Sequence, residues 1–515
     1  MDYSADFRVC SFSIITDNIF FKTFLYRFTK EELSLDGFTA KVSDSALKTN
    51  NPVYTRQMAE HSMARVNDLK EWGFFKSPLC HNTFHKPIEE RNIPVMERIM
   101  ITHLIKENGK IAGAAGFSID DATVHIFRSK SVVLCTGAGG FKPNGFPICD
   151  LTHDGTIMAY NIGAKVTGKE WNDGHSGMVE NAADCYNGWH DMFARTPGVE
   201  GIEVHHDLGV DSNYQAYMLG NPVSSGPGSS TGKQAEGGPY VPAEYVRSIP
   251  SGGGGGPEEG PPGDGPEGGP PGSGDDAASG GAPAGGGGGA AVGGSSAGMS
   301  IHKSEGLVPI NEKGESNIPG LYAAGDALGS YMAGAIYTQI GSSLAGSAVQ
   351  GAIVSEAAAE YCKKTGLPTI SAKTLARVKE EILAPLKRDV GYSPAWVTQI
   401  LQGIMIPNFI LYIKKESLLK AALAYVEELR DHHTPMLRAA NLHELRLAHE
   451  TSNMIISAEM KLKASIMRTE SRCSHYRLDY PEVDYVNWQV WINILKGSDG
   501  QMKFEKQPFS SWPAQ

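Results

Sequence analysis

Paired cysteines, long apolar runs and a secretory signal are all absent from this sequence of 515 residues. Its seven cysteines are dispersed and form no CxxC pair, which is typical of reduced thiols in a cytosolic protein. A zinc site or an iron–sulfur cluster held by these cysteines is therefore not expected. No apolar run approaches the roughly 20 residues that cross a bilayer. The apolar stretch at 11–21 is broken by Asp17 and Asn18 and lacks the basic start of a signal peptide. We predict a cytoplasmic protein with no membrane span and no metal site.

The sequence also lacks an excess of positive charge. It has 46 Lys and Arg against 57 Asp and Glu, a formal net charge of −11. Nucleic acid and anionic membrane surfaces are therefore not expected as its main partners. A local basic pocket for a small acidic substrate is compatible with this balance. With 41% hydrophobic residues, a chain of this length can bury a large core.

A tract of biased composition interrupts the middle of the chain. From 251 to 290 nearly half of the residues are glycine, six are acidic, and none is Lys or Arg. Such a tract cannot bury enough apolar surface to offset the entropy lost on ordering. We predict a disordered surface insertion over about residues 224–292.

Hydrophobic periodicity predicts ordered elements on both sides of this tract. Apolar residues spaced by three to five predict a helix over 54–72, and a turn at 107–110 predicts a hairpin within 97–118. Strands are predicted over 124–128 and 131–135. The second, SVVLC, is a continuous apolar run suited to a buried parallel strand. Small residues predict a closely packed helix over 341–363, and several helices are expected over 371–468. The aromatic tail at 480–512 is expected to be irregular.

Two glycine-rich turns follow predicted strands. CTGAGG at 135–140 comes directly after SVVLC, and GLYAAGD at 320–326 ends in Gly325-Asp326. The second turn is followed by SSLAG at 342–346, at the start of a predicted helix. A strand, a glycine turn and a helix together present backbone N–H groups to an anion or a cofactor. Each motif alone is often only a tight structural turn, but their order and distance are more specific.

With these motifs the sequence resembles the fumarate reductase and succinate dehydrogenase flavoproteins. CTGAGG is similar to that family's ATGG turn, Asp154-Gly155 to its GDG stretch, GLYAAGD to its GLYAAGE/D strand, and SSLAG to its SL turn. The segment from Glu470 to Trp488 resembles the family's C-terminal ESR…H.R.DYP…W segment. These matches run in the family's order from about residue 54 to 490.

The resemblance implies a flavin-dependent oxidoreductase of the α/β class that binds FAD. Its Rossmann-like FAD-binding domain would be formed by residues 51–175 and 299–365. An atypical segment would precede it at 1–50, a reduced cap domain would be inserted at 176–298, and a helical C-terminal domain would follow at 366–515. The resemblance places cofactor contacts at Thr136, Gly137, Ala138, Gly139, Asp154, Gly325, Asp326, Ser342, Ser343, Leu344 and Ala345. It places the catalytic, substrate-side groups at Arg472, His475 and His302.

Two departures from the family bear on function. Residues 1–50 contain no strand–GxGxxG–helix, the element that binds the diphosphate of a dinucleotide, so the FAD-binding domain is expected to be incomplete at its N-terminus. TGKEWNDGH at 167–175 stands where the family has HPTG, and AGAIYTQIG at 333–341 stands where it has HGANRLG. Reduction of a dicarboxylate is therefore not expected. The pattern at 480–488 is at least as close to the adenylylsulfate reductase branch.

Three functional hypotheses follow from the sequence. The first is an FAD-dependent oxidoreductase that transfers two electrons, as a hydride, between reduced flavin and a small anionic substrate. The second is a flavin subunit that passes electrons to an iron–sulfur partner or to another electron-transfer partner. The third is a truncated, non-catalytic homologue. Flavin absorption bands in the purified protein would support the first two, and a colourless folded protein would support the third.

Deletion of residues 251–290 tests the predicted insertion. We expect the thermal midpoint and any flavin content to stay almost unchanged, because a tract with few apolar groups makes few stabilising contacts. Differential scanning calorimetry and the visible spectrum check this. A shift of more than a few degrees would show that the tract packs against the rest of the protein.

Overall fold

The computed structural model describes residues 34–73, 80–137, 139–142, 151–171, 194–195, 205–206, 305–329, 331, 334–335, 342–405, 410, 413–473 and 475–512. The predicted insertion, most of the predicted cap, and the candidate site residues Ala138 and His302 lie outside these ranges. The first 33 residues of the predicted N-terminal segment lie outside them as well.

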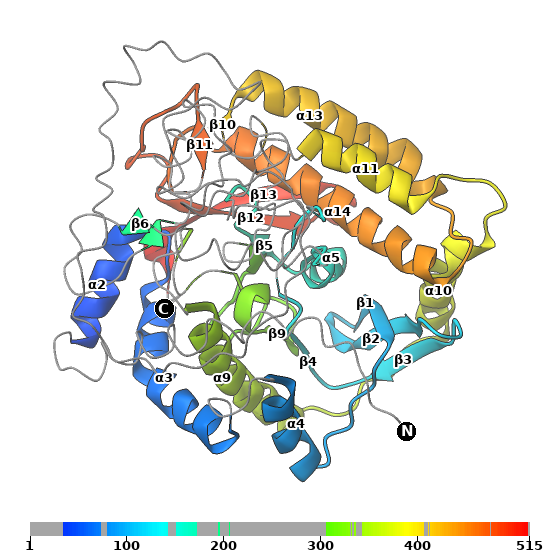
Figure 1. Cartoon of the computed structure of the whole chain (residues 1–515), viewed down its shortest axis with the longest axis horizontal. Coiled ribbons are helices and arrows are strands. Elements are labelled where there is room, and N and C mark those ends of the chain that lie inside the picture. Colours follow the sequence, from blue (N-terminus) through cyan, green and yellow to red (C-terminus); the bar gives the residue numbers. More distant parts are fainter. Residues whose placement is uncertain are drawn as a thin grey trace, which may run out of the picture.

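Helices make up much of the described chain (Figure 1). They are α2 (Leu35–Ser45), α3 (Pro52–Glu71), α4 (Cys80–Glu90), α5 (Asp154–Asn161), α9 (Ser342–Lys364), α10 (Ala372–Leu383), α11 (Pro394–Met405), α13 (Glu416–Glu428) and α14 (Leu442–Met467). The strands are β1 (Ile99–Glu107), β2 (Lys110–Ser118), β3 (Val124–Arg128), β4 (Val132–Leu134), β5 (Val166–Thr167), β6 (Ala194–Arg195), β7 (His205–His206), β8 (Gly306–Leu307), β9 (Leu321–Ala323), β10 (Ile413–Lys414), β11 (Tyr476–Arg477), β12 (Val490–Lys496) and β13 (Met502–Pro508).

Capping side chains fix where several helices begin. Asn51 accepts a hydrogen bond from the backbone N–H of Val53, and Pro52 occupies the first turn of α3. Ser371 caps α10 and Asn441 caps α14 in the same manner. Each cap satisfies an N–H group that would otherwise have no partner inside the helix.

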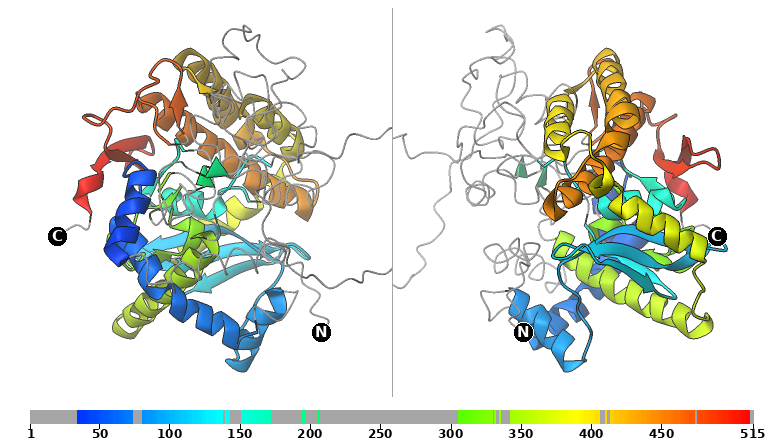
Figure 2. Two further views of the ribbon diagram at one scale, coloured as in Figure 1. Left: turned by 60° about the vertical axis from the view of Figure 1, so that its left-hand side comes forward. Right: turned by 90° about the vertical axis from the view of Figure 1, so that its right-hand side faces the viewer.

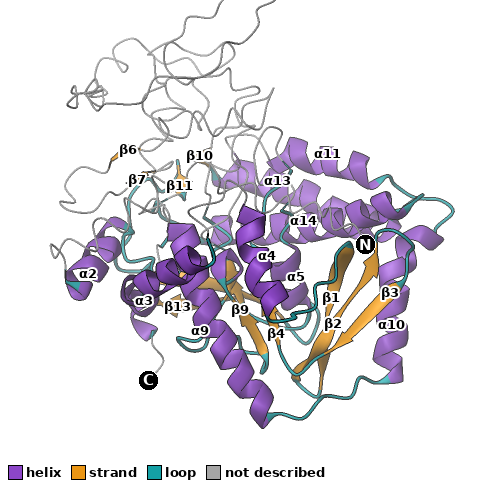
Figure 3. Cartoon of the chain, turned by 60° about the horizontal axis from the view of Figure 1, so that its bottom comes forward, coloured by secondary structure: helices purple, strands orange, loops and turns teal. Residues whose placement is uncertain are grey.

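The strands form several small sheets (Figure 3). The order β1-β2-β3 makes an antiparallel meander, and the order β13-β12-β5-β8 makes a second antiparallel sheet. The pair β4–β9 is parallel, and so is the pair β10–β11. The two members of β4–β9 are far apart in sequence, so this pairing joins the first and second parts of the predicted FAD-binding domain.

Helix α14 lies at the centre of the packing. It contacts α11 and α13 on one side, and Figure 2 shows these three helices grouped together in yellow and orange. On another side α14 packs against α5, where Met460 and Ala464 share a buried cluster with Ile157 and with Ile492 of β12. The meander is covered by α10 through a further apolar cluster. Helix α14 therefore supports both the helical region and the sheet that contains β5.

Several predictions from the sequence are confirmed. The helix expected over 54–72 is α3, the hairpin expected within 97–118 is β1–β2, and the strand expected over 124–128 is β3. The run SVVLC forms β4, which is a parallel strand as expected. The tail expected to be irregular is not: β12 and β13 form an antiparallel hairpin there. Burial of Ile492 and Ile494 against α14 and α5 stabilises this hairpin. Because those helices are not part of the tail, the pattern of the tail alone does not indicate this burial.

Among the residues that the structure describes, no helix combines the length and apolarity needed to cross a membrane. The same residues include no cluster of three or more His, Cys, Asp or Glu arranged to hold a metal ion.

Substitution of Gly155 tests the close approach of α5 to the turn after β4. A Cβ atom at Gly155 would lie 1.8 Å from the Oγ1 atom of Thr136, closer than any van der Waals contact. We expect Gly155→Ala to lower the free energy of unfolding by about 1–3 kcal/mol, the usual cost of overpacking, although Ala favours a helix.

Gly351 in α9 is the matched control, because a Cβ atom there meets nothing within 4 Å. Gly351→Ala should stabilise the protein by up to about 1 kcal/mol. Urea denaturation measures both variants. Equal stability of the two would contradict the described packing of α5.

Candidate functional site

The two glycine-rich turns lie side by side because β4 and β9 pair in parallel. Val132 is in register with Leu321 and Leu134 with Ala323, and the N–H of Ala324 donates to the carbonyl of Leu134 at 3.0 Å. The carboxyl ends of parallel strands meet at one edge of a sheet, and ligands of α/β proteins bind outside this edge. The motifs CTGAGG and GLYAAGD therefore continue into the same region.

The turn after β9 requires its glycine. Gly325 has a φ angle of +65°, and a Cβ atom there would lie 2.8 Å from the Oγ atom of Ser347 in α9. Its N–H donates to Oε1 of Gln350 at 2.7 Å, which fixes the turn against the same helix. Asp326 follows in a short 3-10 helix, Gly325–Ala327, and is half-buried. The first turn of α9, residues 342–345, contains the predicted cofactor contacts Ser342, Ser343, Leu344 and Ala345. A helix N-terminus offers N–H groups and a partial positive charge.

The turn after β4 packs against the start of α5. Gly139 forms a bridge with Thr152, and the N–H of Gly140 donates to the carbonyl of Leu151 at 2.9 Å. Thr136 is exposed and Gly137 is half-buried, with a φ angle of +67°. β4 is thus followed by the exposed Thr136 and the half-buried Gly137, at the edge where Gly325 and Asp326 also lie.

Asp154 holds two elements together. Its carboxylate accepts hydrogen bonds from Thr152 at 2.9 Å and from the side chain of Asn453 in α14. The carboxylate therefore ties the start of α5 to α14. Its predicted contact with a cofactor stays a prediction, and the structure adds this second role.

Arg472 lies in the interior. Its side chain is 0% exposed and forms an ion pair with Glu470, in which Nε and Nη2 bond to the two carboxylate oxygens at 2.8 and 3.0 Å. The Nη1 atom donates to the carbonyl of Leu47 at 2.8 Å. A contact with substrate would require this buried pair to open. The substrate-side role of Arg472 stays a prediction, and the observed contacts join the C-terminal segment to the residues after α2.

Both ring nitrogens of His475 have protein partners. Nε2 lies 3.2 Å from the carbonyl of Arg468, which can only accept, so Nε2 carries the proton. Nδ1 then accepts from the Lys414 ammonium or amine at 2.9 Å. Burial and the neighbouring charges of Lys414, Arg468 and Arg477 hold the pKa of His475 well below its ordinary value, so the ring is neutral. The catalytic role predicted for His475 stays a prediction.

A buried ion cluster around Arg468 joins segments that lie far apart in the sequence. Arg468 is fully buried, and all five of its N–H donors have partners: Glu170, Glu470, and the carbonyls of Trp488 and Val490. The guanidinium also lies 4.5 Å from the ring centroid of Trp171. This cluster fixes the chain after β5 against the C-terminal segment.

A second buried cluster surrounds Glu305. Its carboxylate bonds to Nδ1 of His153 at 2.5 Å and to Nζ of Lys169 at 2.6 Å, and all three side chains are 0% exposed. Burial would raise the pKa of Glu305, but the charges and hydrogen bonds of His153 and Lys169 bring it to about 2. Sequence reasoning missed Glu305, His153 and Lys169, since their spacing in the chain carries no motif.

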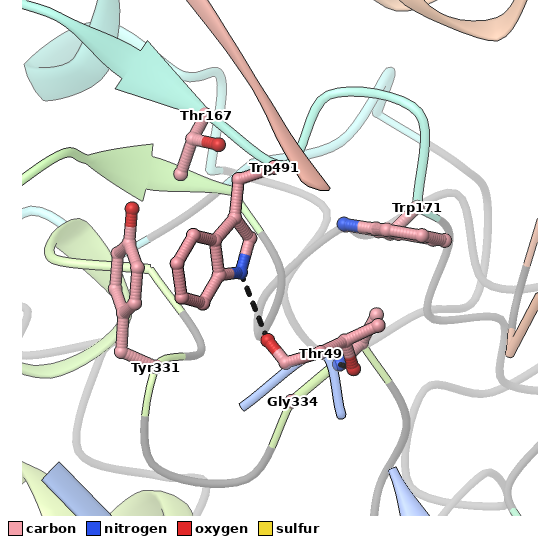
Figure 4. Close-up of a pocket in the computed structure, with 7 residues that line it drawn as sticks. Thr49, Thr167, Trp171, Tyr331, Gly334 and Trp491 are labelled. Atoms are coloured by element: carbon pink, nitrogen blue, oxygen red, sulfur yellow. Dashed lines mark hydrogen bonds between the residues drawn. The ribbon is translucent and has the colours of Figure 1, made fainter. Parts of the chain in front are cut away.

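A pocket lies beside Trp171, whose ring also contacts Arg468 (Figure 4). It is lined by Thr49, Thr167, Trp171, Tyr331, Gly334, Ala335 and Trp491. Trp491 donates to the carbonyl of Thr49 at 2.9 Å, and Figure 4 shows the hydroxyl of Tyr331 directed toward Thr167. Its volume is about 10 Å³, which is room for about one water molecule and not for a cofactor.

The chain is similar in sequence to several flavoproteins. Residues 399–513 match the family model of the fumarate reductase flavoprotein C-terminal region. The chain is 25% identical over 436 residues to an uncharacterized FAD-dependent oxidoreductase of Methanocaldococcus jannaschii, covering 81% of this chain and 72% of that protein. It is 23% identical to one of the subunits of the fumarate reductase (CoM/CoB) of Methanothermobacter marburgensis, covering 84% of this chain and 81% of that protein.

Solved structures show the same fold. A variant of the E. coli quinol fumarate reductase protein FrdA superposes with a TM-score of 0.66 at 15% identity, covering 93% of this chain and 87% of that one. Adenylylsulfate reductase of Archaeoglobus fulgidus superposes with a TM-score of 0.62 at 16% identity, covering 93% and 86%. The resemblance that the sequence motifs indicated is confirmed.

Removal of Arg468 tests the buried ion cluster. We expect Arg468→Met to lower the free energy of unfolding by about 3–5 kcal/mol, because Glu170 and Glu470 would lose a buried partner. Arg377 is the matched control, since it pairs with Glu381 on the surface and is 58% exposed. Arg377→Met should cost less than about 1 kcal/mol. Chemical denaturation compares the two, and equal losses would contradict the described cluster.

Proposed function

We propose that this chain, a relative of the fumarate reductase and succinate dehydrogenase flavoproteins, is an FAD-dependent oxidoreductase that transfers two electrons between reduced flavin and a small anionic substrate. The division into a Rossmann-like FAD-binding domain, an inserted cap and a helical C-terminal domain is part of this proposal. The similarity to the two archaeal relatives over most of their length supports it.

One observation carries the proposal: the parallel pairing of β4 with β9 brings both glycine turns to one edge, beside the start of α9. These groups suit FAD chemically. Backbone N–H groups of a Thr-Gly turn and of a helix N-terminus bind anionic and carbonyl oxygens, and glycine permits close approach. Asp326 supplies a carboxylate that accepts hydrogen bonds from ribityl or ribose hydroxyls.

Bound FAD would supply the redox centre that accepts and returns the two electrons. The chain's own residues would hold and tune it. Thr136 and Gly137 would contact the cofactor from the end of β4, and Asp326 from the end of β9. The N–H groups of 342–345 would favour negative charge near the start of α9. His302, which lies outside the described residues, and the buried pair Arg472 and His475 remain the proposed substrate-side groups.

The substrate is proposed as a small anion other than a dicarboxylate. The sequence has TGKEWNDGH and AGAIYTQIG where fumarate-reducing relatives have HPTG and HGANRLG, so the usual dicarboxylate ligands are replaced.

A second candidate is a flavin subunit that passes electrons to an iron–sulfur partner. The names of several relatives favour it, since they are described as subunits of fumarate reductases. The two candidates differ in the need for a partner. Turnover with a soluble donor and no added protein would support the first.

Asp326 gives the direct test of cofactor binding. We expect Asp326→Ala to weaken FAD binding by about 1.5–3 kcal/mol, the value of a hydrogen bond to a charged group, which is roughly 10- to 150-fold in the dissociation constant. Quenching of flavin fluorescence measures it. Asp499→Ala, in the turn between β12 and β13, controls for loss of a negative charge on the surface.

Unchanged FAD affinity in Asp326→Ala would contradict the proposed cofactor site. In the same preparations, Arg472→Ala separates two roles for that residue. A substrate role predicts retained flavin with oxidation by substrate slowed on the order of 10²-fold. Loss of folding together with flavin would show that the ion pair with Glu470 is its main contribution.

A further inference from the structure

The parallel pair β4–β9 is short, so it does not by itself fix the two glycine turns that follow it. Three residue pairs join the strands. Beyond the strands, the N–H of Gly140 donates to the carbonyl of Leu151, and the N–H of Gly329 donates to the carbonyl of Asp326. These bonds hold each turn within its own part of the chain. A fixed distance between the two turns therefore needs a further contact beyond the strand ends.

His153 supplies this contact on the side of β4. It directly precedes α5 and follows Thr152, which forms a bridge with Gly139 in the turn after β4. A Cβ atom at Gly139 would lie 2.4 Å from the backbone nitrogen of His153 and 2.7 Å from its Cγ atom. The imidazole of His153 therefore lies directly against the backbone of this turn.

Glu305 supplies the contact on the side of β9. It directly precedes β8, and its neighbour Gly306 forms a bridge with Leu328 in the segment after β9. A Cβ atom at Gly329 would lie 3.6 Å from the backbone carbonyl carbon of Glu305. The Oε1 atom of Glu305 lies 2.5 Å from Nδ1 of His153. The pair of His153 with Glu305 thus extends from the turn after β4 to the segment after β9.

The direction of the hydrogen bond within this pair is fixed. Burial opposes the negative charge of Glu305, but His153 and Lys169 bring its pKa to about 2, so the side chain is a carboxylate. A carboxylate only accepts, so Nδ1 of His153 carries the proton and donates. The other oxygen of Glu305 accepts from Nζ of Lys169 at 2.6 Å, and Lys169 also donates to Oγ of Ser457 in α14 at 3.0 Å. The pair is thereby anchored to the helical region.

The backbone of His153 adopts a conformation that glycine adopts freely and other residues rarely. Its φ angle is +64°, in the left-handed region. Such a conformation persists where the surrounding contacts hold it in place. Here the imidazole is 0% exposed and is bonded to Glu305. The contact with Glu305 therefore offsets a backbone cost that glycine at this position would avoid.

We propose that His153 is a positioning residue of the proposed cofactor site: its hydrogen bond to Glu305 fixes the distance between the two glycine turns and thereby sets the affinity for the cofactor. His153 acts through the backbone of Gly139, and Glu305 acts through Gly306 and Leu328. The effect on the cofactor rests on the proposed function, whereas the link between the turns does not.

Two substitutions of equal size test the donor at position 153. Both Asn and Asp tolerate the left-handed region, and each places a polar atom close to the position of Nδ1. The amide of His153→Asn can donate to Glu305, whereas the carboxylate of His153→Asp repels it. At pH 8 we expect His153→Asn to bind FAD within about threefold of the wild type. The dissociation constant of His153→Asp should be raised roughly 10-fold, as measured by quenching of flavin fluorescence.

The pH dependence adds a readout that a loss of packing alone would not give. Position 153 faces the charges of Glu305, Lys169 and Lys461. Two adjacent buried carboxylates share one proton, so the group introduced by His153→Asp should take up a proton between about pH 8 and 6 and donate to Glu305. The FAD affinity of His153→Asp should then recover toward that of the wild type at pH 6. His153→Asn and the wild type should show no such recovery.

The matched control is His85→Asn. Nδ1 of His85 lies 2.9 Å from Oε1 of Glu89 on the surface of α4, and the His85 side chain is 35% exposed. This variant loses a similar contact far from the pair of His153 with Glu305 in sequence, and its FAD affinity should be unchanged. If His153→Asp does not fold at pH 8, His153→Ala replaces it as the variant without a donor, with the same 10-fold loss expected relative to His153→Asn.

Hydrogen–deuterium exchange of the ligand-free protein tests the link between the turns without FAD. At pH 8 the N–H groups of Gly140, Leu328 and Gly329 should exchange faster in His153→Asp than in His153→Asn. A wild type that binds no FAD would contradict the proposed function, and this exchange would still decide whether His153 links the turns. Equal exchange in the two variants would overturn the link. Equal FAD affinity at pH 8 would overturn its effect on the cofactor.

Discussion

The parallel pairing of β4 with β9 is the constraint on which the candidate site depends. Three residue pairs, from Val132 with Leu321 to Leu134 with Ala323, join segments that lie far apart in the chain. Without this register, CTGAGG and GLYAAGD would be two unrelated turns. With it, an exposed Thr136 and a half-buried Asp326 emerge at one edge. The helix α9 completes the edge, because it packs on the short 3-10 helix at Gly325–Ala327 and anchors Gly325 through Gln350.

Buried charge is the second organising feature. Arg468, Glu170, Glu470 and Arg472 form one continuous ion cluster, and Glu305 links His153 with Lys169 in another. Such groups are costly to remove from water, so each is retained only with nearly all its hydrogen bonds made. The clusters connect the segment after β5, the region before β8 and the C-terminal segment. They place Trp171 at the pocket and leave two lysines whose only partners in the described part of the chain are neutral acceptors.

Local patterns were sufficient to predict elements whose burial is continuous or periodic. SVVLC was recognised as a parallel strand because both of its faces are apolar, and α3 because its apolar residues repeat along one face. The hairpin β12–β13 was missed because the exposed polar residues Lys503, Glu505 and Lys506 interrupt β13, and its apolar face is explained only by α14 and α5. The ion pair of Arg468 with Glu170 joins residues 298 positions apart, so no local sequence pattern predicts it. Motif resemblance located the glycine turns correctly, whereas the contacts of Arg472 and His475 required the three-dimensional packing.

Hydrogen–deuterium exchange of the purified chain, with and without FAD, tests the central claim most directly. We predict that FAD slows exchange of backbone N–H groups at 136–140, at 325–329 and in the first turn of α9 from Ser342. Peptides from α13 should be unaffected, since this helix packs against α11 and α14. Protection confined to other segments, or FAD binding with no protection at either glycine turn, would contradict the claim that β4 and β9 together form the cofactor site.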